Sequence, residues 1–302
     1  MPNSIQIIID SDSSLGYETK VLSNIFKFPL IFILTIWVAL KKMILGSKLR
    51  TNTFWFDGIS PVCRKIKENA MRWKALDTAY NYEFKKDNTF ATRITDFWLN
   101  IKNAQAVRNR LKLVKKELKQ EIQNLSDKKL EIRLLSIAAG SAQGVIEVMA
   151  DFKQKGIPTE AIFLDLDPTA LEYSKKMAQK LGVADQIKFV NKSVKELEEA
   201  VEDFKPNIIE MVGFLDYRPR EKAINLIGKI NQILDSNGVA LISNIAPNIE
   251  RYFLYKVMNW PMIYRSPEQL ADVVVKGGFD PQKCEIVYEP LKIHGIAICR
   301  KK

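Results

Sequence analysis

The chain has 302 residues, of which 47% are hydrophobic and 27% charged, so it can bury a substantial core and is not wholly disordered. Its three cysteines lie far apart and it has one histidine, which excludes a disulfide framework and a His- or Cys-rich metal site. The net charge of +11 is concentrated in residues 41–120, which hold 19 basic and 7 acidic residues. The sequence therefore indicates a reducing compartment, no bound metal, and a basic region suited to an anionic partner.

The first predicted elements are a tail and an apolar helix. Residues 1–19 are polar and are expected to form a loose tail. Residues 20–46 are predicted to be a helix around the uncharged run 28–40, which Lys41 and Lys42 follow. A helix of about 13 residues spans roughly 20 Å, less than the roughly 30 Å hydrocarbon core of a bilayer.

Three interpretations of this helix remain open. It can lie in the membrane interface, cross the bilayer once with the basic region in the cytoplasm, or pack against the folded protein. The run is apolar on all faces and basic residues follow it. These two properties favour attachment of residues 28–45 to the cytoplasmic face of an anionic membrane.

Residues 47–127 are predicted to form several helices with a basic surface. Apolar residues recur at helical spacing between residues 104 and 122, which predicts an amphipathic helix. These apolar residues are Val107, Leu111, Val114, Leu118 and Ile122. A basic helical surface binds the phosphates of nucleic acid or anionic lipid, and the alternative is an ordinary solvated surface.

From residue 133 the pattern changes to alternating strands and helices, which predicts a parallel sheet with helices on both faces. The last two apolar runs are joined by a connection too short for a parallel crossover, so an antiparallel hairpin is expected. The predicted strands are 133–138, 161–166, 187–191, 207–212, 238–244, 284–290 and 293–299, and the predicted helices are 143–155, 168–181, 194–203, 219–235 and 266–277.

Two features of this region carry the functional argument. The first apolar run ends in a turn of small residues, Ala138–Ala142, where the backbone can lie directly against a ligand. The second apolar run ends at Asp165, about 20–25 residues further on, and its carboxylate can bind both hydroxyls of a ribose. This spacing is typical of a nucleotide-binding βαβ unit.

The turn, the acid and the closing hairpin together resemble the class I S-adenosylmethionine-dependent methyltransferases over residues 133–302. The resemblance implies an α/β fold, a Rossmann-like seven-stranded methyltransferase sheet with a terminal antiparallel hairpin, preceded by an N-terminal helical region. Segments 103–110, 210–218, 244–250 and 260–265 are similar to a narrower family of bacterial methyltransferases, some of which carry a hydrolase domain in front. The expected parts are a tail (1–19), an anchor helix (20–46), a basic helical region (47–127) and a cofactor-binding domain (128–302).

The resemblance also implies that S-adenosyl-L-methionine is the cofactor. Gly140 keeps the central glycine of the family's loop, whereas alanines replace the flanking glycines and Ser136 replaces the leading acid. Asp165 matches the ribose-binding acid, and Ser193 stands where an acid often binds the adenine amino group. The expected cofactor-binding residues are Ala138, Gly140, Ser141, Asp165, Leu166, Ser193 and Gly213.

Acceptor-binding groups are expected at the carboxyl ends of the fourth and fifth strands. Methyl transfer needs an in-line nucleophile about 3 Å from the methyl carbon, a dry pocket and in some cases a base. The candidates for catalysis are Tyr217, Tyr264 and Asp216, and those for substrate binding are Asn244 and Arg265. Their alternatives are structural: packed rings for the tyrosines, a helix cap for the aspartate and an ion pair for the arginine.

The leading hypothesis is a methyltransferase that acts on a small or lipid-like acceptor at the membrane face. An RNA methyltransferase that uses the basic helices is an alternative, although the sequence has no RNA-binding module or base-flipping motif, so nucleic acid is the less favoured partner. The altered loop keeps a non-catalytic cofactor-binding or scaffold protein as a further alternative. A nicotinamide oxidoreductase is disfavoured because the loop lacks the second glycine of the dinucleotide-binding motif.

Overall fold

The computed structural model describes residues 5–84, 87 and 89–301, and the chain divides into two units. Unit 1 comprises Met1–Leu15, Arg110–Ala246 and Ile263–Lys302, and unit 2 comprises Gly16–Asn109 and Pro247–Met262. This division differs from the expected parts. The first residues of the chain and residues 110–127 belong with the sheet, whereas residues 247–262 belong with the N-terminal helices.

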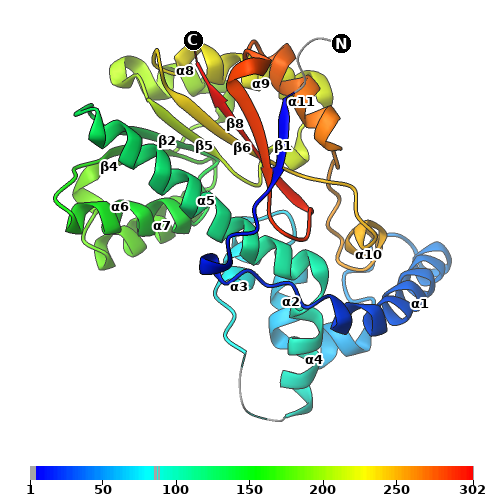
Figure 1. The fold of residues 1–302 in the computed structure, drawn as a ribbon. Helices are drawn as coiled ribbons and strands as arrows, with labels where there is room; N and C mark the ends of the chain where they lie inside the picture. The colour runs from blue at the N-terminus through cyan, green and yellow to red at the C-terminus, as the bar shows by residue number, and fades with distance from the viewer. Residues whose placement is uncertain (1–4, 85–86, 88, 302) are drawn as a thin grey trace. The chain divides into compact units, whose positions relative to one another are not determined.

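Unit 1 is built on a sheet whose described strands run in the order β1-β7-β8-β6-β5-β2-β3-β4 (Figure 1). All neighbouring strands are parallel except those that pair with β8, which forms the predicted hairpin with β7. The strands are β1 (Gln6–Ile9), β2 (Arg133–Ile137), β3 (Glu160–Leu164), β4 (Ile187–Val190), β5 (Ile208–Met211), β6 (Val239–Ile245), β7 (Cys284–Tyr288) and β8 (His294–Arg300). The seven predicted strands are therefore present, together with an eighth.

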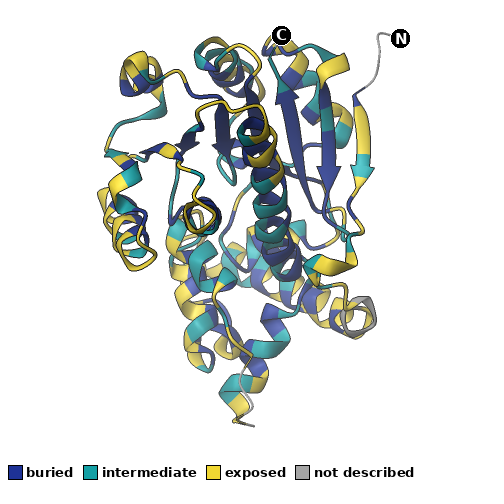
Figure 2. Ribbon diagram, turned by 60° about the vertical axis from the view of Figure 1, so that its left-hand side comes forward, coloured by how far each residue is buried: buried dark blue, intermediate teal, exposed yellow. Residues whose placement is uncertain are grey.

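The eighth strand, β1, corrects the expectation of a loose tail over residues 1–19. Its residues pair in parallel with β7, from Gln6 opposite Glu285 to Ile9 opposite Tyr288. The run of isoleucines suits a strand because β-branched side chains pack well on a pleated surface, but it lacks the alternation that identifies a half-buried strand. Figure 2 shows the inner strands buried and this edge strand largely exposed.

Helices cover both faces of the sheet in unit 1. One face packs against α8, α9 and α11 and forms the main hydrophobic core. Figure 1 shows α6, α7 and the part of α5 that belongs to unit 1 on the other face. The helices are α5 (Lys102–Asp127), α6 (Gln143–Gln154), α7 (Pro168–Lys180), α8 (Leu197–Val201), α9 (Arg220–Ile233) and α11 (Pro267–Lys276). Because the inner strands are parallel, the loops that follow β2, β3 and β5 meet at one edge of the sheet.

Unit 2 is helical and has an aromatic centre. The ring of Phe253 stacks on Trp98 with a centroid distance of 5.0 Å, and Phe56 lies edge-on to both rings. Phe253 brings the segment that follows β6 into this unit. The elements are α1 (Val21–Leu45), a π-helical turn (Phe54–Gly58), α2 (Pro61–Glu68), α3 (Trp73–Tyr80), α4 (Phe90–Leu99), the first turns of α5, and α10 (Arg251–Lys256).

Helix α1 is the predicted apolar helix. Its segment Ile25–Leu45 has a mean hydropathy of 2.0 and is long and apolar enough to cross a membrane. Core helices of soluble proteins have the same length and composition, so these properties alone do not assign a span. In the structure α1 is not free on all faces, because Ile31, Leu34 and Val38 are buried.

Candidate functional site

The turn after β2 has the backbone of a glycine-rich loop although it holds a single glycine. Ala138, Gly140 and Ala142 have φ angles of 52°, 57° and 48°, in the left-handed region that favours glycine. The backbone N–H of Ala142 donates to the carbonyl of Ala139 at 2.8 Å, which closes the turn at the start of α6. The two alanines thus hold a conformation that costs each about 1 kcal/mol relative to glycine.

Asp165 joins this turn to the next strand. It follows β3, and its carboxylate accepts hydrogen bonds from the backbone N–H groups of Gly140 and Asp167, both at 2.8 Å. The Asn191 side chain donates to the carbonyls of Asp165 and Leu166 at 3.0 Å, so the loops after β2, β3 and β4 are connected. Burial raises the pKa of the Asp165 carboxyl, although the backbone donors oppose this shift.

The remaining expected cofactor residues lie around the same edge of unit 1. Ser193 begins a short helix and exchanges capping hydrogen bonds with Glu196, so its hydroxyl already serves the backbone. Gly213 has a φ of 80° after β5, and its N–H donates to the Ser243 hydroxyl at 2.9 Å. Ser141 is buried in the first turn, and Leu166 is exposed next to Asp165.

The residues expected to bind substrate are bonded to each other. The Arg265 guanidinium donates to the Asn244 side-chain oxygen and to the Leu215 carbonyl, and the Asn244 amide donates to the Ile263 carbonyl at 3.1 Å. Both side chains are buried. They therefore fix the segment before α11 against the end of β6.

Asp216, a candidate for catalysis, lies in the same buried region. Its carboxylate accepts from the Ile245 backbone N–H at 2.8 Å, instead of capping the helix that follows. Burial raises the pKa of its carboxyl, and the positive charges of Arg110 and Arg265 oppose this shift. The other two candidates, Tyr217 and Tyr264, are half-buried on the loops that follow β5 and precede α11.

A buried acid that the sequence argument did not select lies beside the first loop. Glu210 of β5 pairs with Ser136 of β2 across the sheet, and the Ser136 hydroxyl donates to the Glu210 carboxylate at 2.6 Å. Burial raises the pKa of Glu210 to about 7, while the Ser136 bond and the charge of Arg110 lower it. The signal in the sequence is a lone acid inside an apolar strand, which needs partners when it is buried.

Arg110 and His294 complete this buried polar region. Arg110 lies on the apolar face of α5, between Val107 and Val114 in the helical repeat, and is 2% exposed. Burial and the charge of Arg110 lower the pKa of His294, so the imidazole is neutral at physiological pH. Within the described part of the chain, neither of its ring nitrogens has a hydrogen-bond partner. A charged residue within an apolar helical stripe is the feature that indicates such a region in the sequence.

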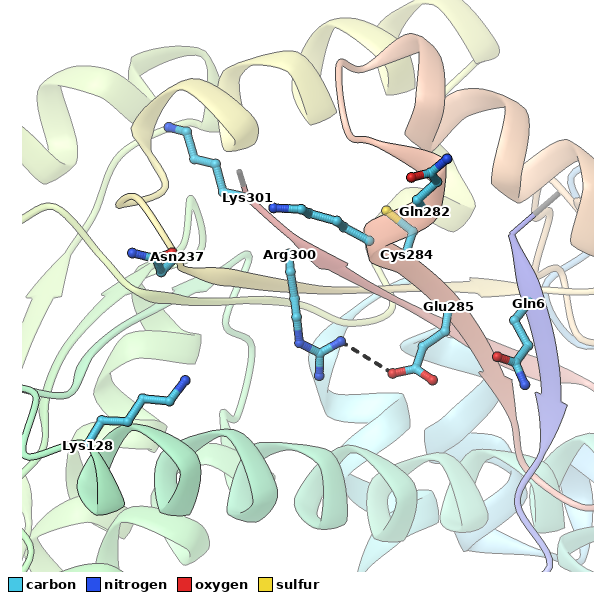
Figure 3. Close-up of a pocket in the computed structure, with 9 residues that line it drawn as sticks. Gln6, Lys128, Asn237, Gln282, Cys284, Glu285, Arg300 and Lys301 are labelled. Atoms are coloured by element: carbon cyan, nitrogen blue, oxygen red, sulfur yellow. Dashed lines mark hydrogen bonds and ion pairs between the residues drawn. The ribbon is translucent and has the colours of Figure 1, made fainter. Parts of the chain in front are cut away.

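A cavity of about 530 Å³ lies at the opposite edge of the sheet (Figure 3). It is lined by the first residues of β1 and β7 and by the end of β8, where Arg300 pairs with Glu285 and Glu121. Ligands of open parallel sheets bind outside the carboxyl ends of the strands, so this basic cavity is separate from the predicted cofactor site. Among the described residues, no group of three His, Cys, Asp or Glu side chains is arranged to hold a metal ion.

Comparison with known proteins gives one family match. The sequence model of a family described as "Putative methyltransferase" matches residues 71–301. No curated protein matches the chain.

Several solved structures share the fold. A "possible exported protein" from Bordetella parapertussis has a TM-score of 0.67 at 12% identity, covering 96% of this chain and 99% of that chain. The magnesium protoporphyrin IX methyltransferase from Synechocystis, crystallised with S-adenosylhomocysteine, has a TM-score of 0.51 at 12% identity, covering 75% and 92%. An O-methyltransferase family protein from Burkholderia thailandensis has a TM-score of 0.51 at 17% identity, covering 80% and 71%. At these identities the likeness shows the fold alone.

Proposed function

This chain belongs to the methyltransferase family whose sequence model spans residues 71–301 and is an S-adenosyl-L-methionine-dependent enzyme, and from this premise we propose that it methylates a small acceptor over the carboxyl ends of β2, β3 and β5. Family membership confirms the resemblance drawn from the sequence, and the shared fold confirms the predicted sheet. The position of the reaction is supported by one observation above all. The Asp165 carboxylate is bonded to the Gly140 N–H within the first loop.

Asp165 is the proposed ribose ligand. An ionised carboxylate has about four acceptor positions. The N–H groups of Gly140 and Asp167 use two of them, which leaves room for both hydroxyls of a ribose. These two donors also fix the carboxylate in place before the cofactor binds. The other proposed cofactor residues are Ala138, Gly140, Ser141, Leu166, Ser193 and Gly213, which lie on the loops at this edge of the sheet.

Glu210 is the proposed replacement for the missing leading acid of the first loop. Ser136 occupies the position of that acid, and its hydroxyl bonds to the carboxylate of Glu210 on the adjacent strand. A carboxylate is therefore present one strand away from its usual position. In this proposal Glu210 attracts the ammonium group of the cofactor's methionine end, and the positive charge of Arg110 helps to keep the acid ionised.

When bound, the cofactor supplies a methyl group activated by a sulfonium, so the chain has mainly to position the acceptor and exclude water. Tyr217 and Tyr264 are the proposed residues for acceptor contact, because their loops border the carboxyl ends of β5 and β6. Asn244 and Arg265 support the acceptor side by fixing the loop that carries Tyr264. Asp216 is a weaker candidate for a base, because its carboxylate already accepts the Ile245 N–H.

A small acceptor is favoured over RNA by the pairing of the basic residues of α5. Lys115 pairs with Glu147, Lys116 with Asp10, and Lys119 with Asp151 in unit 1. Such pairs reduce the positive potential that would attract a phosphate backbone. The fold neighbour that methylates magnesium protoporphyrin IX also has a small acceptor, which supports the same choice.

The proposed location is the cytoplasmic face of a membrane, with residues 28–45 of α1 as the point of attachment. This helix exposes large apolar side chains along most of its length. Exposed apolar surface of this extent marks an interaction site, and a membrane would also concentrate a lipid-like acceptor near the enzyme.

The methyl-transfer proposal is tested by incubating the protein with S-adenosylmethionine carrying a tritiated methyl group and a cell extract. The extract is then separated into lipid, RNA, protein and small-molecule fractions. We expect label in the lipid or small-molecule fraction, and no label above background with Asp165→Ala. Label confined to RNA would replace this proposal with the RNA alternative, and label transfer unaffected by Asp165→Ala would remove the assigned site.

A further inference from the structure

One stripe of α1 packs against the rest of unit 2. Ile31, Leu34 and Val38 recur at helical spacing and are buried, and α1 lies beside α10 (Figure 1). The Lys42 ammonium also donates to the Lys256 carbonyl at 2.7 Å, which joins the end of α1 to the end of α10. A helix held along its length in this way presents only its outer face to another partner.

The outer face of α1 is strongly apolar. Phe26, Met43 and Ile44 are 84%, 77% and 75% exposed, and Ile33 and Trp37 are also exposed between them. A soluble protein rarely exposes so many large apolar side chains on one helix unless they bind something. Phe26 and Ile44 are 18 residues apart on this helix, so the exposed face extends at least from residue 26 to residue 44.

Two further segments of unit 2 expose aromatic rings. Tyr252 and Tyr255 of α10 are exposed, and so are Phe54 and Trp55 of the π-helical turn. Their inner neighbours hold these segments together, because Phe253 of α10 packs edge-on against Phe56 of the turn, with a centroid distance of 6.2 Å. The exposed rings of both segments therefore lie next to a buried aromatic contact that joins the two segments.

The charge of these segments indicates which kind of partner binds their exposed apolar side chains. The sequence from residue 19 to residue 56 contains six basic residues and no acid. The exposed rings also lie beside cations: Lys41 lies 5.1 Å from the Trp37 ring, Lys256 4.9 Å from the Tyr255 ring and Arg251 4.7 Å from the Tyr252 ring. Tryptophan and tyrosine beside lysine and arginine are typical of the headgroup region of a membrane. A second copy of this chain would instead bring like charges together.

From these observations we propose that α1, the π-helical turn and α10 form one docking face that lies in the plane of an anionic lipid bilayer without crossing it. This inference rests on the proposed membrane attachment and is independent of methyl transfer. It extends the attachment from one helix to three segments. It also excludes a span, because a spanning helix would have to leave its contacts with α10.

The composition of the face is tested by vesicle sedimentation with the full chain, using phosphatidylcholine vesicles with and without phosphatidylglycerol. Two double variants, Phe54→Ser with Trp55→Ser and Tyr252→Ser with Tyr255→Ser, remove exposed rings outside α1. Each is expected to weaken binding to the anionic vesicles by about tenfold. The matched control, Leu130→Ser with Leu181→Ser, removes exposed apolar side chains of unit 1 and should bind as the unaltered chain does.

A third variant, Ile33→Ser with Met43→Ser in α1, separates the two proposals. If it weakens binding while the ring variants do not, the attachment through residues 28–45 stands and the three-segment face is overturned. If the unaltered chain does not bind vesicles, both are overturned. Self-association that the ring variants abolish would overturn the lipid assignment in favour of a second copy.

The orientation is tested by quenching tryptophan fluorescence with lipids brominated at defined depths, and the contributions of Trp37 and Trp55 are isolated with Trp37→Phe and Trp55→Phe. Trp37 lies near the middle of the apolar segment Ile25–Leu45. In-plane docking predicts that shallow bromines quench both residues most strongly. Strongest quenching of Trp37 by bromines at the chain ends would show a span and overturn the proposal.

Discussion

Two regions of the molecule show unusual burial, and they do so in opposite ways. One is the edge of the sheet in unit 1 where the parallel strands end, and the other is the outer face of α1 in unit 2. At the sheet edge, charged and polar side chains such as Glu210, Asp216 and Arg265 are buried and bonded within the protein. On α1, side chains as apolar as Phe26 and Met43 are exposed. Buried polar groups and exposed apolar groups are the two informative exceptions to the rule that apolar residues lie inside. The comparison therefore fits the two proposals, in which unit 1 carries the ligand chemistry and unit 2 carries the docking face.

The largest expected effect on stability is the loss of Arg265. Arg265→Ala removes the guanidinium that bonds to Asn244 and to the Leu215 carbonyl, and the buried Asn244 side-chain oxygen loses this charged donor. Removing one member of a buried charged network costs about 3–5 kcal/mol, which urea denaturation measures. Arg220→Ala removes an exposed ion pair with Asp272 and is the control, with an expected cost below about 1 kcal/mol. Equal costs for the two variants would refute the stabilising role of the buried Arg265 contacts.

The next effect is the pH dependence that Glu210 contributes. Burial raises the pKa of Glu210 from its ordinary value of 4.5 to about 7 in the folded protein, so the folded state favours the protonated carboxyl. The free energy of unfolding should therefore fall as pH rises from about 4.5 to about 7, and stay level above that. The glutamine of Glu210→Gln cannot ionise. The free energy of unfolding of this variant, relative to that of the unaltered chain, should therefore rise by about 3 kcal/mol between about pH 4.5 and about pH 7.

Urea denaturation at several pH values measures this difference. Glu117 has a pKa raised to about 7 for the same reason, but it is present in both chains and cancels from the comparison. A difference between the two chains that does not change with pH would contradict a buried, ionisable Glu210.

A smaller effect distinguishes the two faces of α1. Val38→Ala removes methyl groups from a fully buried position and is expected to cost about 2 kcal/mol. Ile33→Ala removes more apolar surface from an exposed position and is expected to change stability by less than about 0.5 kcal/mol. Thermal or urea unfolding compares the two variants. If Ile33→Ala is the more damaging, the exposed face of α1 is covered within the protein.

The smallest predicted effect concerns the first loop. Ala142→Gly should raise the free energy of unfolding by about 1 kcal/mol, because glycine adopts the positive φ of this position without strain. Ala139→Gly is the matched control in the same turn, where φ is not positive, and should lower stability by about 0.5–1 kcal/mol. The same sign for both variants would show that the loop has a different backbone in solution.

The sheet of unit 1 could be predicted from the sequence because each inner strand is a short apolar run between clear turn signals. Pro168 in the first turn of α7 and Gly277 at the end of α11 were readable for the same reason. Strand β1 was not predictable, because an exposed edge strand carries neither a full apolar run nor a strict alternation. Its pairing with β7 depends on a contact between the two ends of the chain.

The site was predictable only where a motif marks it. Asp165 and Gly140 follow from the spacing of two strand ends, and the structure brings them into contact. The bond between Ser136 and Glu210 links residues 74 positions apart, so no local pattern contains it. The pairing of Arg265 with Asn244, the two residues expected to bind substrate, is equally non-local.

The most direct test of the account is the affinity for S-adenosylmethionine, measured by isothermal titration calorimetry for the unaltered chain and for Asp165→Ala. Asp185→Ala is the matched control, an exposed acid that pairs with Lys153 outside the site. Loss of two hydrogen bonds to a charged acceptor predicts an affinity at least roughly 100-fold lower for Asp165→Ala, and an unchanged affinity for Asp185→Ala. Equal affinities for Asp165→Ala and the unaltered chain would contradict the account.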